Sequence, residues 1–203
     1  MRKIGITGGV GSGKSLVLQD LRERFGAAVY EADQIAKDIQ KAGTDCFCRI
    51  VEHFGKEILQ LDGELDRKKL GAVVFSDREE LKALNQIVHP AVIKEIRRLS
   101  EEEETKGTEV FVLEAALLTD PVYRELLEEI WYIHVPEAVR EERLERSRGY
   151  TKAQTESMMA SQPSEEEFQA CADAVIENGG TFEETKRQMD RLLCVQGKTT
   201  TGE

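Results

Sequence analysis

The sequence lacks several features that define other classes of protein. Its 203 residues include only three histidines and four cysteines, and no two cysteines have C-x-x-C spacing, so a structural zinc site is not expected. No apolar run approaches about 18 residues, the length that a membrane-spanning helix needs. Residues 4–7 are too short and too glycine-rich for the core of a signal peptide. We therefore expect a cytoplasmic protein with no membrane partner.

Positive charge is also scarce. The chain has 28 Lys and Arg against 39 Asp and Glu, a formal net charge of -11. General nucleic-acid binders need clustered basic residues to neutralise phosphates, so no nucleic-acid partner is expected. With 40% hydrophobic and 33% charged residues, the composition is that of a globular protein with a sizeable core. Any basic phosphate site must therefore be local.

Short apolar runs of strand length alternate with helical patterns. The first helical pattern has Leu18, Leu21 and Phe25 on one face and Gly26 at the position of a C-terminal cap. Strand followed by helix followed by strand indicates an α/β fold with a parallel sheet, right-handed crossovers and a ligand beyond the carboxyl ends of the strands. The runs that predict its strands are residues 3–7, 27–30, 109–113, 130–135 and 174–177.

Two regions interrupt this alternation. Residues 33–104 show helical periodicity and no convincing strand, which predicts an inserted helical subdomain. Residues 137–170 are rich in Arg and Glu and poor in large apolar residues, as in a mobile lid. We expect a core made of residues 1–32, 105–136 and 171–195, and a disordered tail at 196–203.

One helix of the insertion can be predicted in more detail. Pro90 suits the first turn of a helix, because its missing N–H is not needed there. The acidic run 101–104 is expected to end the segment in solvent. The residues expected on the apolar face are Val92, Ile93, Ile96 and Leu99.

Residues 8–15, Gly-Gly-Val-Gly-Ser-Gly-Lys-Ser, match the phosphate-binding motif G-x-x-x-x-G-K-[ST]. The motif lies after a strand and before a helix, so its amides and the helix dipole can hold the phosphates of ATP. Lys14 is predicted to contact the outer phosphates and Ser15 to bind Mg²⁺. A merely glycine-rich turn would not need Lys, Ser, strand and helix in register. The predicted nucleotide-binding residues of this segment are Gly9, Gly11, Ser12, Gly13, Lys14, Ser15 and Leu16.

Two acidic residues, Glu31 and Asp33, directly follow the second predicted strand. They should emerge at the same edge of the sheet as the phosphate loop, one orienting an acceptor hydroxyl and the other facing Mg²⁺ or its waters. Asp33 is our candidate for the catalytic base. The alternative is that Asp33 caps a helix that begins near Gln34.

Over residues 3–193 the sequence resembles the dephospho-coenzyme A kinase family. The resemblance implies a P-loop NTPase-like sheet flanked by helices, with a helical acceptor-binding insertion and a helical lid. It also implies Mg-ATP as donor, the ribose 3′-hydroxyl of dephospho-CoA as acceptor and Asp33 as base. The matching pieces are residues 4–15, 32–36, Leu65-Asp66-Arg67, Val74-Phe75, His89-Pro90, Leu117-Leu118, Arg143-Leu144, Gln162 and 172–178.

Several positions depart from the family pattern. Glu31 and Ala116 stand where Asp and Pro are usual, Asp120 replaces Glu, and Ser147 and Met158 stand where Arg is expected. These departures leave open which lid arginines contact phosphate.

The lid arginines predicted to stabilise transferring charge are Arg143 and Arg148. Pairing of Glu142 with Arg146 on an exposed helix is the alternative role for such arginines. Asn178, just after the last strand, is predicted to bond the adenine edge, with a turn role as the alternative.

Two other functions compete with this hypothesis. A different P-loop kinase for a nucleotide or metabolite would share the loop and the lid, but residues 65–90 argue against it. A GTP-driven switch would carry an Asn-Lys-x-Asp signature, which the sequence lacks. The sequence does not define an oligomeric state.

Overall fold

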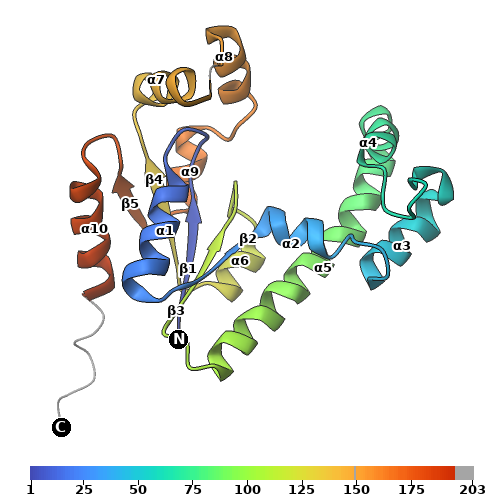
Figure 1. The fold of residues 1–203 in the computed structure, drawn as a ribbon, viewed down its shortest axis with the longest axis horizontal. Helices are drawn as coiled ribbons and strands as arrows, with labels where there is room; N and C mark the ends of the chain where they lie inside the picture. Colours follow the sequence, from blue (N-terminus) through green and yellow to red (C-terminus); the bar gives the residue numbers. More distant parts are fainter. Residues whose placement is uncertain (149, 195–203) are drawn as a thin grey trace. The chain divides into compact units, whose positions relative to one another are not determined.

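The structure, a computed structural model, describes residues 1–148 and 150–194 (Figure 1). The predicted disordered tail lies outside these residues. In chain order the elements are β1 (Arg2–Thr7), α1 (Lys14–Phe25), β2 (Ala28–Glu31), α2 (Ala32–Asp38), α3 (Asp45–Phe54), the 3₁₀ turn η1 (Lys56–Ile58), α4 (Arg67–Ser76), α5 (Arg78–Thr105), β3 (Val110–Glu114), α6 (Pro121–Leu126), β4 (Glu129–His134), α7 (Glu137–Arg148), α8 (Lys152–Ala160), α9 (Glu165–Cys171), β5 (Ala174–Glu177) and α10 (Phe182–Cys194).

The strands form one sheet in the order β2-β3-β1-β4-β5. Strand β1 pairs in parallel with β3 and with β4, and β4 pairs in parallel with β5. Strand β1 is therefore central, with β3 on one side and β4 on the other. In open parallel sheets, ligands bind beyond the carboxyl end of strands at such a point. The α/β prediction is confirmed, and the predicted strands lie within one or two residues of the observed ones.

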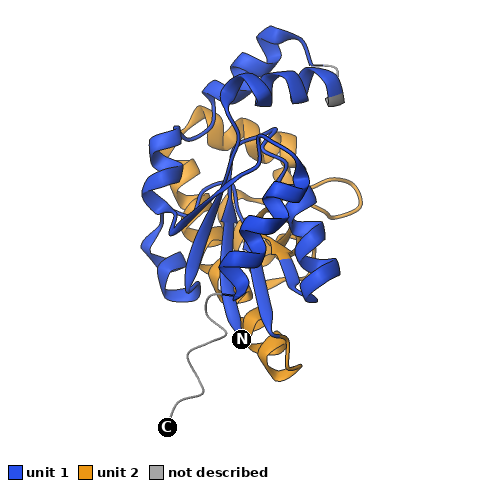
Figure 2. Cartoon of the chain, turned by 90° about the vertical axis from the view of Figure 1, so that its left-hand side faces the viewer, with its two compact units in different colours: residues 1–29, 109–203 blue, residues 30–108 orange. Residues whose placement is uncertain are grey.

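The chain divides into two compact units, Met1–Val29 with Glu109–Glu203, and Tyr30–Thr108 (Figure 2). In the first unit, the apolar strand residues pack with α1 and α10 into one core. Trp131 and Tyr132 of β4 are fully buried. The buried residues of this core are Ile4, Ile6, Val17, Leu18, Leu21, Ala27, Val110, Val112, Trp131, Ile133, Ile176 and Met189.

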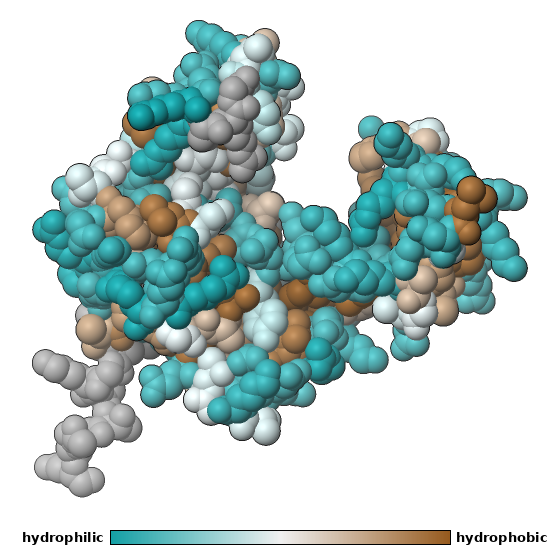
Figure 3. Space-filling model, in the orientation of Figure 1, coloured by the Kyte–Doolittle hydropathy of each residue, from teal (hydrophilic) through white to brown (hydrophobic). Residues whose placement is uncertain are grey.

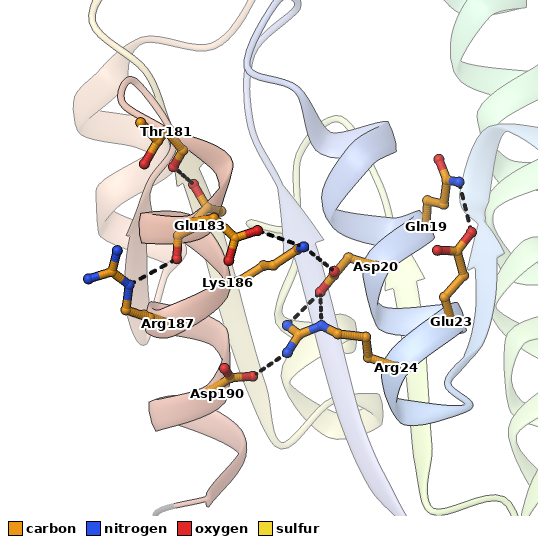
Figure 4. Close-up of polar contacts among 10 residues, drawn as sticks. Gln19, Asp20, Glu23, Arg24, Thr181, Glu183, Lys186, Arg187 and Asp190 are labelled. Carbon is orange, nitrogen blue, oxygen red and sulfur yellow. Dashed lines mark hydrogen bonds and ion pairs between the residues drawn. The ribbon is translucent and has the colours of Figure 1, made fainter.

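Ion pairs join α1 to α10 (Figure 4). Asp20 is buried, and its Oδ2 accepts hydrogen bonds from the guanidinium of Arg24 at 2.8 and 2.6 Å. The same guanidinium reaches Asp190 of α10 at 2.7 Å, and Lys186 lies 4.0 Å from Asp20. Helix α1 ends as predicted at Gly26, which is left-handed at φ 60°. These contacts hold the helix whose first turn follows the phosphate loop.

The second unit is helical and has its own core. Within residues 30–108, all of them described, the only β pairing after β2 is an isolated bridge between Leu59 and Leu65. Three of its helices begin with side-chain caps, from Thr44, Asp66 and Asp77. The buried core residues are Cys46, Ile50, Ile58, Leu65, Leu70, Val74 and Ile87. Figure 3 colours the surface of the whole chain by hydropathy, and hydrophilic residues predominate on the face shown.

The prediction for Pro90 is wrong. Pro90 lies in the interior of α5, which starts twelve residues earlier at Arg78. Ile87 on one side of the proline and Val92 and Ile93 on the other are buried. Burial of that apolar face on both sides offsets the one backbone hydrogen bond that a proline removes.

The prediction that the acidic run 101–104 lies in solvent is wrong for Glu103. Its side chain is buried and accepts hydrogen bonds from Lys106 Nζ at 2.8 Å, Thr108 Oγ1 at 2.6 Å and the Tyr30 hydroxyl at 2.9 Å. The bond from Lys106, then those from Thr108 and Tyr30, lower the pKa of Glu103 to about 2. Glu103 therefore anchors the end of α5.

None of the helices in the described ranges combines the length and apolar composition needed to cross a bilayer.

Candidate functional site

The loop between β1 and α1 depends on glycine at several positions, among them Gly11 and Gly13. Gly11 and Gly13 have left-handed φ angles of 79° and 82°. A Cβ on Gly13 would lie 2.6 Å from Asn178 Nδ2, and one on Gly11 would lie 3.1 Å from the Arg140 carbonyl oxygen. Helix α1 begins directly afterwards at Lys14, so its unpaired N–H groups and positive dipole end adjoin the loop. This arrangement can bind an anion.

Ser12 supports the same conclusion. Its side chain is buried, and its Oγ has no hydrogen-bond partner among the described residues. The hydroxyl lies inside the loop, since a Cβ on Gly8 would be 3.1 Å from it. A buried hydroxyl without a partner costs about 1–3 kcal/mol, so this site fits a ligand that supplies an acceptor, as a phosphate does.

Lys14 lies back over the loop. Its Nζ donates to the Gly8 carbonyl at 2.5 Å and to the Gly9 carbonyl at 3.5 Å, and forms an ion pair with Glu114 Oε1 at 3.6 Å. Glu114 is the last residue of β3, one position beyond the predicted strand. Glu114 was not among the predicted site residues, although extending the buried apolar run by one position includes it.

The first turn of α1 presents Ser15 and Leu16. Both are exposed, and Leu16 retains 46% of its accessible surface. The Ser15 hydroxyl and the Glu114 carboxylate are oxygen ligands of the kind that Mg²⁺ prefers. Across residues 1–148 and 150–194 no cluster of three acidic, His or Cys side chains forms a metal site. These residues fit a Mg²⁺ that takes most of its ligands from phosphates and water.

Asn178 lies against the phosphate loop. Its Nδ2 donates to the Ser12 carbonyl at 2.7 Å, and its Oδ1 accepts from Thr185 Oγ1 of α10 at 2.8 Å. The residue is buried, so both bonds are shielded from water. The amide thus connects the phosphate loop to α10, a contact that was not predicted from the sequence.

Arg143 reaches the same place from α7. Its Nη2 donates to the Asn178 carbonyl at 2.8 Å, and its Nη1 lies 3.7 Å from the position of a Cβ on Gly13. The structure therefore brings Arg143, Asn178 and Gly13 together. The side chain of Arg148, the second predicted lid arginine, lies outside the described residues.

Two further side chains contact the loop at Val10. Gln162 Oε1 accepts from the Val10 N–H at 2.9 Å, and Arg140 Nε donates to the Val10 carbonyl at 3.0 Å. Gln162 appeared only as part of the family resemblance, and Arg140 was missed. The signal for Arg140 is its position one turn before buried Leu144 on α7.

Asp33 belongs to the second unit. It is the second residue of α2, which begins directly after β2, and its side chain is exposed. The carboxylate has no hydrogen-bond or ion-pair partner within the described chain. The N-cap position of α2 is occupied by Glu31, without a side-chain cap, so Asp33 does not cap this helix.

A parallel sheet whose central strand is followed by a glycine-rich loop, and then by a helix that begins with Lys14 and Ser15, defines a P-loop protein that binds nucleoside triphosphates. The same fold occurs in shikimate kinase from Acinetobacter baumannii, which superposes with a TM-score of 0.54 at 15% identity, covering 98% of this chain and 96% of that one.

The comparisons then identify the family. The sequence model of the family described as dephospho-CoA kinase matches residues 2–184. The dephospho-CoA kinase of Carboxydothermus hydrogenoformans is 40% identical over 190 residues, covering 94% of this chain and 92% of its own. A solved protein from Thermus thermophilus has a TM-score of 0.73 at 32% identity, covering 98% and 97%. The chain belongs to the dephospho-CoA kinase family and is a kinase.

Proposed function

We propose that this kinase transfers the γ-phosphoryl group of ATP to the ribose 3′-hydroxyl of dephospho-CoA, giving CoA and ADP. Family membership over residues 2–184 supports the substrate pair. The observation that carries the chemistry is the loop itself, which brings together left-handed glycines, Lys14 and a buried Ser12 hydroxyl that has no partner among the described residues, and these features support phosphate binding.

On the donor side, phosphoryl transfer depends on positioning and on stabilising negative charge. The amides of the loop from Gly9 to Gly13, other than that of Val10, which donates to Gln162, would hold the phosphates. Lys14 would stabilise the negative charge that develops on the leaving oxygen. Arg143 adds positive charge beside Gly13, and Arg148 is a further candidate on the same helix. Asn178 and Leu16 border the nucleotide side of this site.

On the acceptor side, Asp33 would accept the proton of the attacking hydroxyl and orient that hydroxyl toward the γ-phosphorus. Its exposure leaves the carboxylate available to a substrate. Residues 33–104 would form the acceptor subdomain and residues 137–170 the lid that excludes water.

Mg²⁺ would be held by the Ser15 hydroxyl together with phosphate oxygens and water, with Glu114 beside Lys14 as a candidate for contacting those waters. The bound ion would neutralise charge on the β- and γ-phosphates. A cytoplasmic location stays a prediction from the sequence.

The test is to mix the purified protein with ATP, MgCl₂ and dephospho-CoA and to follow CoA by mass spectrometry. We expect an ATP-dependent gain of one phosphoryl group, at the 3′-oxygen by NMR. Other nucleotides and small alcohols run in parallel test the alternative of a different P-loop kinase. No product above the level of the Lys14→Met protein would contradict the assignment.

A further inference from the structure

The peptide groups on both sides of Val10 are held by side chains from the segment 137–170. The Val10 N–H donates to Gln162 Oε1 at 2.9 Å, and the Val10 carbonyl accepts from Arg140 Nε at 3.0 Å. Arg140 Nη2 also donates to Gln162 Oε1 at 3.0 Å. The three residues therefore form a closed set of hydrogen bonds, which we call the Val10 clamp.

Helix α7 packs against the loop beside the Val10 clamp. A Cβ on Gly9 would lie 2.6 Å from the Arg140 guanidinium carbon, so the guanidinium packs closely against this glycine. One turn further along α7, Leu144 is buried, and it lies 3.1 Å from the position of a Cβ on Gly11. Helix α7 thus contacts the loop at both glycines that flank Val10, so the clamp rests on a packed interface.

The clamp acts on two successive peptide planes. The N–H of Val10 belongs to the plane shared with Gly9, and its carbonyl belongs to the plane shared with Gly11. Glycines on both sides give this stretch high backbone freedom, and an unconstrained loop would have to lose that freedom on binding phosphate. Fixing both planes in advance removes part of this cost.

We propose that Arg140 and Gln162 are positioning residues that hold the phosphate loop in its nucleotide-binding conformation through Val10. The proposal rests on the proposed function in one respect, that the ligand of the loop is a nucleotide. It assigns to the lid segment a role in binding the donor that does not require these two side chains to touch the phosphates.

The test compares Gln162→Leu, Gln162→Glu, Arg140→Ala and the double variant Arg140→Ala/Gln162→Leu. Gln169→Leu and Arg187→Ala are matched controls, since both are exposed residues of the same types in α9 and α10. Affinity for Mg-ADP is measured by calorimetry, and hydrogen exchange of the Val10 amide by NMR. KM and kcat for ATP are measured in the CoA assay.

We expect Gln162→Leu and Arg140→Ala each to weaken ADP binding and raise KM for ATP by about five- to tenfold, the effect of losing shared hydrogen bonds. Gln162→Glu keeps the acceptor oxygen and should stay within about twofold of the unchanged protein. The double variant should lose less than the product of the two single losses, because the bonds share partners. The Val10 amide should exchange faster in Gln162→Leu.

A merely structural role would reduce the amount of folded enzyme, and so apparent kcat, without changing KM for ATP or ADP affinity. Unchanged affinity in both single variants, or unchanged exchange at Val10 in Gln162→Leu, would overturn the proposal. The proposed function fails separately, if the unchanged protein makes no CoA. Hydrogen exchange of the Val10 amide tests the Val10 clamp whether or not the protein makes CoA.

Discussion

The phosphate loop and the Asp33 region are organised in opposite ways. Loop residues are bonded to side chains far away in the sequence: Asn178 reaches Ser12 across 166 positions, and Gln162 reaches Val10 across 152. Asp33 is exposed and has no partner of this kind in the described ranges. A cradle for phosphates works best when it is rigid before the ligand arrives, whereas a catalytic base must keep its carboxylate for the substrate.

The largest expected effect comes from disrupting the acceptor side alone. Asp33→Asn removes the base and should lower kcat by about 10²- to 10⁴-fold, while ADP affinity stays within about twofold. The control is Asp38→Asn, an exposed aspartate of the same helix. Steady-state kinetics and calorimetry measure the two quantities. Equal losses in both would assign Asp33 to the metal or to folding instead.

The phosphate loop, the other region in this comparison, is tested by Lys14→Met. Loss of the ammonium should lower kcat by about 10²- to 10³-fold and also weaken ADP binding, because the charge acts on bound phosphates and on the transition state. Lys82→Met, at an exposed lysine of α5, is the matched control. A loss of less than about tenfold in kcat/KM would show that Lys14 lies away from the reacting phosphates.

A third substitution tests whether distant contacts shape the loop. Asn178→Asp replaces the donor to the Ser12 carbonyl by an oxygen, which repels that carbonyl. We expect ADP affinity to fall about tenfold, the cost of one lost buried hydrogen bond. Asn85→Asp, at an exposed position of α5, should change nothing. Unchanged ADP affinity would mean that the bond between Asn178 and Ser12 does not organise the site.

The smallest effect is expected at Glu103, in the second unit. Glu103→Gln should lower the free energy of unfolding at pH 7 by about 1 kcal/mol, because it weakens the bonds to Lys106, Thr108 and Tyr30. The pKa of Glu103 falls from 4.5 to about 2 in the folded chain. Its stabilisation is therefore complete above pH 4.5 and is lost as the pH falls toward 2.

Urea unfolding of the Glu103→Gln protein at several pH values checks this, with Glu101→Gln as the exposed control. The difference from the unchanged protein should shrink between pH 4.5 and 2. A constant difference over that range would contradict the role of the charge, and a changed kcat at pH 7 would contradict a purely structural role.

The strands could be predicted from the sequence because burial on both faces leaves continuous apolar runs such as residues 130–135. Asp33 was predicted from its position after the second strand and again from the family resemblance, whereas Gln162 was indicated by the resemblance alone. Pro90 was misplaced because a local rule for proline ignores the burial of Ile87 and Ile93 on either side of it. Glu103 was misplaced because an acidic run gives no sign of which member faces Tyr30 and Thr108.

The sequence by itself determined the phosphate loop, since its glycines, Lys14 and Ser15 act within one strand, one turn and the start of one helix. It also determined the alternation of strands and helices, because hydrophobic periodicity is a local property. Only the tertiary structure decided which distant side chains form hydrogen bonds and ion pairs with the loop. Arg140, Gln162, Asn178 and Glu114 reach it through packing of elements separated by a hundred residues or more, and no spacing along the chain records such contacts.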